Sequence, residues 1–406
     1  MPKKHRPRRV GLLTRPAGAV LKGDGARLKY VIKGPAGGQA EYNVLLTASE
    51  LDTVRSEIAA VHEPTHGAWD TFVSQRSSTV LAATPDVYAG GDITPINTYT
   101  QLDVDGHLCR NAAILWALSG TSSYGAKAQE FLLAWATGNQ AVPYEDTGDY
   151  VGYQGGYHQS YGYYSFALAY DLVKGYSGFD SGDHATLVAW FRDIADTLKT
   201  YWDFWTTQLG SGRQAYRWST LTMDTYCFNR ARDTSVCPLA AQLAAAIVSD
   251  YTDHIEMLYD DANPLNVPDC MHDATQPDND GDDVPAHGVP VPNAQINATM
   301  DYMSYNTRVI TMLYKMSKNL GRDTAGMVSD LHATWTYLAL FSNPDGESSP
   351  ITSGDSFQMS LLTARMQQAV WMFGDQRFLN CVGSSTPSGF YDVQYIGPIT
   401  LMFPTP

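Results

Sequence analysis

The sequence predicts an all-α protein built from paired helices, and three observations support this fold class. Apolar residues recur three and four positions apart along most of the chain, which is the spacing of one face of a helix. A hydrophobic content of 44% is sufficient for a sizeable core. The 34 Gly and 21 Pro suit a bundle or toroid of helices joined by elaborate loops.

The clearest helix pair spans residues 112 to 135, on both sides of the turn SGTSS. Its apolar positions are Ala112, Leu115, Trp116, Leu118, Ala128, Phe131, Leu132 and Trp135. Further helices are expected over Tyr161–Lys174, Asp183–Leu209, Cys237–Tyr259, Asn297–Leu320, Ala325–Phe341 and Ser356–Phe373. Residues 260–295 lack periodicity and are dense in Pro, Asp and Asn, so we expect a long loop there.

The amino-terminal part differs from the helical body. Residues 1–16 contain several Lys and Arg and no acidic residue, which predicts a flexible basic tail. Within residues 17–55 two β-like runs, LKYVIKG and EYNVLLT, flank the turn-rich PAGGQA, which predicts a small β-containing docking segment. Thr47 and Glu50 have the spacing of a capping box at the start of a helix. The helical domain is assigned to residues 56–406.

The charge distribution excludes several classes of partner. Of 27 basic side chains, six lie in the first fifteen residues, so the remainder has 21 basic and 42 acidic side chains and a net charge of −21. Nucleic acid and anionic membranes are poor partners for such a body, and a polyanionic substrate would need a local basic groove. No apolar run reaches the roughly 18 residues of a membrane span, and no cleavable signal peptide is evident.

Cysteine and metal-ligand patterns are uninformative for function. Five widely spaced cysteines argue against a disulfide framework, and no zinc-type spacing of Cys and His occurs. We therefore expect no metal and no cofactor.

Three segments resemble helices of the alginate lyase superfamily of polysaccharide lyases, the group that includes chondroitin AC lyase-like enzymes. Cys109–Gly138 is similar to a helix pair of that family, and Tyr161–Val173 is similar to the helix that follows it. Thr299–Gly321 resembles the helix with the catalytic tyrosine. The resemblance implies an (α/α)n toroid, an incomplete helical barrel, that cleaves a uronate-containing glycan by β-elimination.

The resemblance also indicates candidate catalytic residues. Tyr302 takes the place of the catalytic tyrosine, and Tyr305 lies on the same helix face as a second candidate or as a wall of the subsite. Asn229 takes the place of the family's carboxylate-binding asparagine, but no histidine follows it. Counting back from Tyr302, the position of the family's arginine is occupied by Gln295. His158, after two glycines, is the candidate to replace the missing histidine.

Eliminative cleavage has three chemical requirements. The carboxylate must be partly neutralised, the proton alpha to it must be removed, and the leaving glycosidic oxygen must be protonated. Asn229 with Arg230 or Arg232 suits the first requirement. A tyrosine suits the other two if a nearby cation lowers its pKa from the usual value of about 10.

Aromatic side chains offer a further candidate binding surface. Tyr157, Tyr161 and Tyr164 are spaced along one helix face and would stack sugar rings, with Trp218 in a following segment. The alternative is that this stripe lines the core. In the long loop, Asp278–Asp283 alternate around a glycine as in calcium loops, although a solvated acidic turn is the simpler interpretation.

Two other functions remain open at this point. The protein is either a lyase or a non-catalytic carbohydrate-binding or structural virion component, such as a phage tail protein that docks other virion proteins through its amino-terminal segment. A glycoside hydrolase using two of Asp171, Asp224, Asp233 and Asp301 is the second alternative. Each function places the protein outside the cell or on a virion.

Overall fold

The computed structural model describes residues 44–87, 95–138, 151–210, 233–263, 266–275, 296–322, 324–339, 359–375, 377–378, 381, 391–392 and 397–404. Its helices are α1 (Ala48–Ala60), α2 (Thr65–Ala82), α3 (Pro95–Ser119), α4 (Ser122–Gly138), α5 (Val151–Val173), α6 (Ser181–Gly210), α7 (Asp233–Val248), α8 (Thr252–Leu258), α9 (Val267–Thr275), α10 (Ile296–Asn319), α11 (Ala325–Ala339), α12 (Met359–Phe373) and α14 (Ile399–Met402). Strands β1 (Tyr391–Asp392) and β2 (Gly397–Pro398) pair antiparallel. The prediction of an all-α fold is confirmed.

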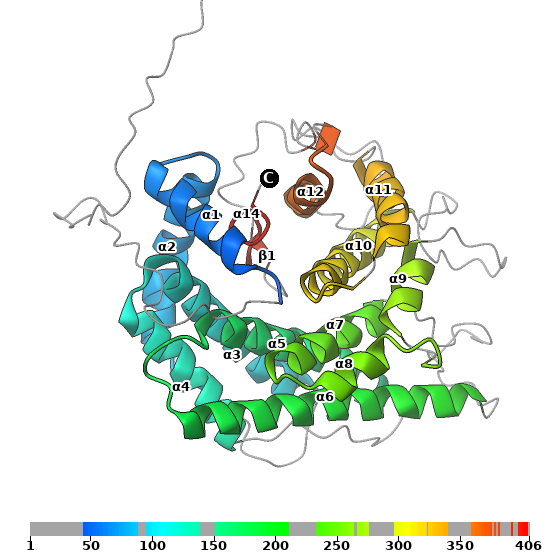
Figure 1. The fold of residues 1–406 in the computed structure, drawn as a ribbon, viewed down its shortest axis with the longest axis horizontal. Coiled ribbons are helices and arrows are strands. Elements are labelled where there is room, and N and C mark those ends of the chain that lie inside the picture. The colour runs from blue at the N-terminus through cyan, green and yellow to red at the C-terminus, as the bar shows by residue number, and fades with distance from the viewer. Residues whose placement is uncertain are drawn as a thin grey trace, which may run out of the picture.

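The helices form an incomplete ring of two layers (Figure 1). The inner layer contains α3, α5, α7, α10 and α12, and each helix packs on the next in this series. The outer layer contains α2, α4, α6 and α11, while α8 and α9 lie beside α7 and α10. Inner helices are therefore enclosed on most sides, and from Thr307 to Ser317 every residue of α10 is buried.

The inner helices α3 and α5 run in the same direction and cross closely. Arg110 Nη1 donates to Ser165 Oγ over 3.3 Å, and nearer the start of both helices Gly106 lies against Gly162. A Cβ added at Gly162 would lie only 2.6 Å from the carbonyl oxygen of Leu102. The absence of a side chain at this position allows the close approach of the two backbones.

The outer helix α6 runs antiparallel to both α5 and α7. Between α5 and α6, Phe166 contacts Trp190 and Tyr170 contacts His184. Between α6 and α7, Ala195 contacts Gln242 and Arg192 contacts Ser249. In each set the residue numbers rise in one helix as they fall in the other. It follows that α5 and α7 are parallel to each other.

The last two inner helices have this same direction. Arg322, just past α10, pairs with Glu256 in α8, the helix that directly follows α7, so α7 and α10 end on one side of the ring. Between α10 and α12 the contacting pairs are Arg308 with Gln368 and Lys315 with Trp371. Residue numbers rise together in these pairs, so α10 and α12 are parallel.

The ring consequently has two different rims. All five inner helices begin at what we call the N-terminal rim and end at the C-terminal rim. Connections at the C-terminal rim are short and cover residues 120–121, 174–180, 249–251 and 320–324. Longer connections lead to the N-terminal rim and cover residues 83–94, 139–150, 211–232, 276–295 and 340–358. Most residues of these longer connections lie outside the described part of the chain. Long connecting segments on a helical scaffold commonly carry function, so the N-terminal rim is the side on which a site is expected.

Three boundaries differ from the sequence predictions. The expected helix Cys237–Tyr259 is divided into α7 and α8 because Asp250 adopts a left-handed conformation, with φ of 48°, and Arg192 binds the carbonyl groups of Ser249 and Asp250. The expected loop 260–295 contains α9, whose start is capped by Asn266 accepting from the backbone N–H of Asp269 over 2.8 Å.

The third difference concerns the boundary placed between residues 55 and 56. It falls inside α1, whose predicted capping box is present, with Thr47 and Glu50 exchanging hydrogen bonds. Val44 is fully buried, and its backbone N–H donates to Asp171 in α5 over 3.0 Å. Residues 44–55 thus belong to the helical body, while the basic tail 1–16 and residues 17–43 lie outside the described residues. The expected β-like run EYNVLLT ends at residue 47, and its described part, residues 44–47, forms no strand.

Candidate functional site

Several of the predicted catalytic residues lie in the first turns of parallel inner helices. Tyr302 and Tyr305 are in the second and third turns of α10, and Tyr157 and His158 are in the second turn of α5. For these four residues the structure describes the backbone only. Because α5 and α10 both begin at the N-terminal rim, all four positions lie toward that rim.

The remaining predicted site residues are placed by sequence alone. Asn229, Arg230 and Arg232 precede α7 in the chain, Gln295 directly precedes α10, and Trp218 follows α6. All five lie outside the described residues, as do Asp224 and Asp278–Asp283. Their assignment to the site therefore stays a prediction.

Tyr161 does not form the exposed sugar platform that was expected. Its side chain is only 6% exposed, and Tyr164 on the same stripe is fully buried among the apolar residues of the inner layer. Stacking on a sugar requires an accessible ring face. The alternative interpretation of this stripe, core lining, is the correct one for Tyr161 and Tyr164.

Asp171 does not suit the role of a hydrolytic acid. It is fully buried at the end of α5, where its two carboxylate oxygens accept hydrogen bonds from the Val44 N–H and from Lys174 Nζ, each over 3.0 Å. This carboxylate holds the amino-terminal segment against α5. Of the other candidate acids, Asp233 is the first residue of α7 and Asp301 lies in α10. The structure describes only the backbone of these two residues.

The inner layer contains buried cations that the sequence analysis missed. Arg110 in α3, Arg308 in α10 and Lys315 in α10 are each at most 1% exposed. The sequence signal that could have indicated such a buried cation is a single basic residue inside a run of apolar helix positions, as Arg110 is in HLCRNAAILWAL. These residues place positive charge inside a body whose net charge is strongly negative.

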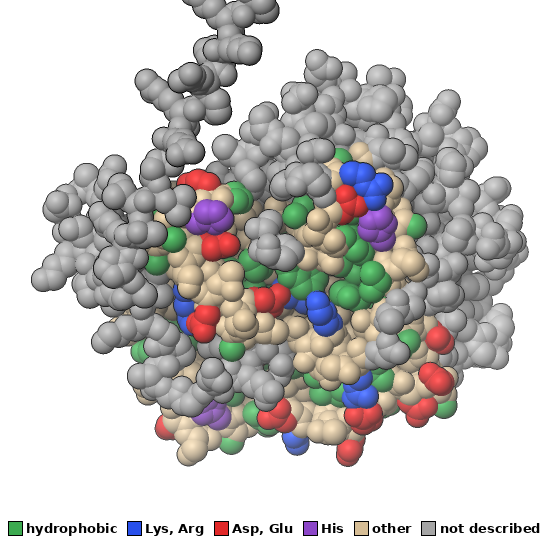
Figure 2. All heavy atoms as spheres, turned by 45° about the horizontal axis from the view of Figure 1, so that its top comes forward, with side chains coloured by type: hydrophobic (Ala, Val, Ile, Leu, Met, Phe, Trp, Pro, Cys, Tyr) green, Lys and Arg blue, Asp and Glu red, His purple; other side chains and the backbone are tan. Residues whose placement is uncertain are grey.

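The described basic side chains do not form one patch on the face drawn in Figure 2. Figure 2 shows Lys and Arg scattered among acidic groups on the face that it draws, rather than gathered into one patch. Among the described residues, no group of three or more His, Cys, Asp or Glu is arranged to hold a metal ion. No helix in the described part of the chain has the length and apolar character needed to cross a membrane.

Comparisons with known proteins identify the fold. No protein-family model matches the sequence, and no curated protein matches it. Among solved structures, alginate lyase A1-III from Sphingomonas species A1 matches with a TM-score of 0.53 at 15% identity, covering 92% of this chain and 97% of that one. Histidine-to-alanine and tyrosine-to-phenylalanine variants of alginate lyase A1-III, each complexed with a tetrasaccharide, match with a TM-score of 0.56 at the same identity and coverage.

This likeness extends over nearly the whole length of both chains, and it agrees with the two-layered ring of helices. The protein has an alginate lyase-like fold, a helical toroid.

Proposed function

We propose that the protein is a polysaccharide lyase that cleaves an acidic, uronate-containing glycan by β-elimination. The observation that carries the proposal is the nearly full-length match to an alginate lyase, including complexes with a tetrasaccharide, in a chain whose predicted catalytic tyrosines lie near the start of α10.

The direction of the inner helices suits an anionic substrate. Each helix N-terminus carries a partial positive charge from its aligned peptide dipoles, and five such ends lie at the N-terminal rim. This supplies local positive potential from the backbone itself. The C-terminal ends of the outer helices lie on the same side of the ring, so this favourable field is confined to the inner part of the rim, where an acidic glycan would meet the five N-termini first.

The chemistry is assigned to residues at or before the N-terminal ends of α5, α7 and α10. Asn229 with Arg230 or Arg232 holds the uronate carboxylate and stabilises the negative charge that develops on it. Tyr302, as phenolate, removes the proton alpha to the carboxylate, and the electron pair released forms the double bond as the glycosidic bond breaks. The phenol then returns the proton to the leaving oxygen, so no water is consumed. His158 completes the site, and Tyr305 is the alternative base.

A second candidate function is a non-catalytic carbohydrate-binding or structural virion role. It is favoured by the absence of a histidine after Asn229 and by Gln295 at the position where the resemblance leads us to expect an arginine. A lyase or a carbohydrate-binding protein would meet its glycan outside the cell, so we propose an extracellular or virion-associated location. In the virion-associated version, residues 1–43 dock the protein onto other virion components.

The test is the ultraviolet absorbance of the conjugated double bond that elimination creates, measured with a panel of acidic glycans. Tyr302→Phe or Tyr305→Phe should lower the rate by at least about a hundredfold, because each removes a candidate base and acid. Tyr314→Phe is the matched control, since it changes a buried tyrosine of the same helix farther from the rim. Reducing ends without absorbance would indicate hydrolysis, and glycan binding without cleavage would favour the non-catalytic role.

A further inference from the structure

The two ends of the helical ring meet at a seam between α1 and α12. The carboxy-terminal residues 397–404, which contain β2 and α14, lie at this seam (Figure 1). They pack on α2, α3 and α12, and so contact both the first and the last helices of the ring. Residues 397–404 therefore connect the first helices of the ring with its last helix.

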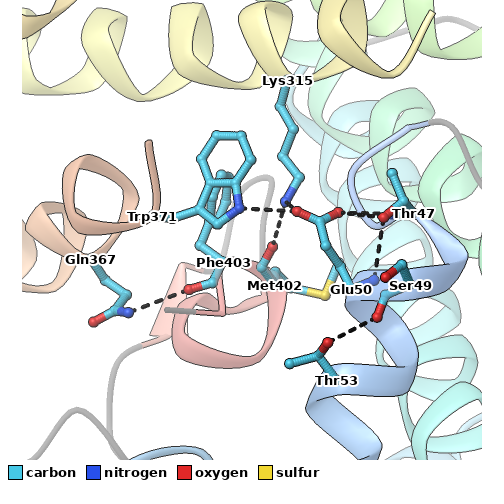
Figure 3. Close-up of polar contacts among 9 residues, drawn as sticks. All are labelled: Thr47, Ser49, Glu50, Thr53, Lys315, Gln367, Trp371, Met402 and Phe403. Carbon is cyan, nitrogen blue, oxygen red and sulfur yellow. Dashed lines mark hydrogen bonds and ion pairs between the residues drawn. The ribbon is translucent and has the colours of Figure 1, made fainter. Parts of the chain in front are cut away.

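One buried lysine contacts every part of this seam. Lys315 Nζ, from α10, lies 3.0 Å from Glu50 Oε1 of α1 and 3.5 Å from the carbonyl oxygen of Met402 (Figure 3). The ammonium also lies over the rings of Trp371 and Phe403, at 4.0 Å and 4.9 Å from their centroids. The Lys315 side chain has no exposed surface. Contacts of a desolvated cation with aromatic faces are stronger than those at the surface.

Glu50 is held in position by other hydrogen bonds. Its Oε2 accepts from the Thr47 N–H over 2.8 Å as part of the α1 cap, and its Oε1 accepts from Trp371 Nε1 over 3.0 Å. Gln367 of α12 in turn donates to the Phe403 carbonyl over 3.3 Å. The carboxylate that caps α1 thus binds α10 and α12 as well.

This arrangement couples the seam to α10. Neighbouring inner helices pack directly on each other, and among the described side chains Glu50 joins α1 to α10 through its ion pair with Lys315 and to α12 through its hydrogen bond from Trp371. Lys315 is the fully buried partner of this pair, and removing its counter-ion would leave an uncompensated buried charge, which is strongly destabilising. Because α10 is one uninterrupted helix from Ile296 to Asn319, a displacement at Lys315 is expected to be transmitted along it toward Tyr302 and Tyr305.

We propose that Glu50, Lys315, Trp371 and residues 397–404 form a latch that closes the ring and positions α10. In this proposal Lys315 is a positioning residue for Tyr302 and Tyr305, which lie ten to thirteen residues earlier on the same helix, about 15–20 Å away. The positioning part rests on the proposed lyase function, while the closure of the ring does not.

The first arm of the test is hydrogen exchange in the full-length protein. Glu50→Gln keeps the shape of the side chain and an acceptor for Trp371 but leaves the Lys315 cation without its counter-ion. Exchange should rise by about tenfold or more at the end of α12 and in residues 397–404, as expected for loss of a charge-assisted contact.

The matched control is Glu256→Gln. It makes the same change in an exposed ion pair with Arg322 at the end of α10, and it should leave exchange at the seam unchanged. Equal exchange at the seam in the wild type and in Glu50→Gln would overturn the latch. A rise of the same size in both variants would overturn it as well.

The second arm measures kcat and KM on a glycan that the wild type cleaves. It distinguishes an effect on the position of the catalytic tyrosine from a general loss of stability. Glu50→Gln should lower kcat by about tenfold or more with little change in KM, since small displacements of a catalytic group are costly. The double variant Glu50→Gln with Lys315→Met, in which no charge is left unpaired, should recover part of the loss. An unchanged kcat in a variant with a loosened seam would overturn the positioning role. Absence of cleavage by the wild type would refute the proposed function, and hydrogen exchange would still decide the latch.

Discussion

The pH dependence of the Lys315 contribution to stability follows from its burial. Desolvation lowers the pKa of Lys315 from its ordinary value of 10.5 to about 8, although Glu50 opposes this and Lys318 adds to it. Below pH 8 the lysine is charged in both the folded and the unfolded chain. Between pH 8 and 10.5 the unfolded chain keeps the proton that the folded chain has lost.

The sign and size of the effect follow by linkage. Because the unfolded state binds more protons in this window, the free energy of unfolding rises with pH there. The difference between the two pKa values of Lys315, 10.5 in the unfolded chain and about 8 in the folded one, corresponds to about 3 kcal/mol. The free energy of unfolding gains this amount progressively between these two pH values. Lys315→Met removes the titrating group. The stability of the wild type relative to this variant should therefore rise by about 3 kcal/mol between about pH 7.5 and about pH 10.5.

The assay is urea unfolding of both proteins at several pH values, followed by fluorescence and by circular dichroism, with the m-value used to check that the transitions are comparable. Taking the difference between the two proteins cancels groups that titrate in both, such as Tyr170 and Tyr259, whose pKa values burial raises to about 12. If the difference in unfolding free energy between the two proteins does not change with pH, the Lys315 ammonium is not desolvated in the folded state. A difference that falls with rising pH would show that the Glu50 interaction outweighs burial.

Three further predictions concern the inner and outer layers. Gly162→Ala places a methyl group against an α3 carbonyl and should cost about 1–3 kcal/mol in urea unfolding, whereas Gly182→Ala at the exposed start of α6 should not destabilise. His254 is buried with a pKa lowered by desolvation, so stability should fall as pH drops below 6.5, and His254→Asn should remove that slope in thermal unfolding. Trp135→Phe removes the 2.7 Å hydrogen bond to buried Asp105 and should cost about 1–3 kcal/mol, so an unchanged midpoint would contradict this reasoning.

Much of the fold was predictable because helix periodicity is a local property. Residues 112–135 already indicated the pair α3 and α4, and the Thr47 and Glu50 spacing indicated the capping box of α1. Boundaries were wrong where a single residue redirects the chain, as Asp250 does between α7 and α8. Apolar spacing continues through such a break, so periodicity cannot detect it.

The candidate site was predictable only in part. The position of Tyr302 and Tyr305 on a long helix was expected and is observed in α10, but their role rests on resemblance. Tyr161 shows the limit of pattern reasoning, because a stripe of tyrosines at helical spacing has the same sequence signature in a core and in a sugar platform. Only packing decides which side of the stripe is covered.

The sequence by itself determined the all-α class, most helix positions and the strongly acidic body, since these depend on composition and on spacing within single helices. Tertiary structure alone decided that the inner helices are parallel, that they begin at a common rim, and that Glu50 meets Lys315 across 265 positions of the chain. Such contacts depend on how a ring of helices closes, which is a property of the whole molecule rather than of any local segment.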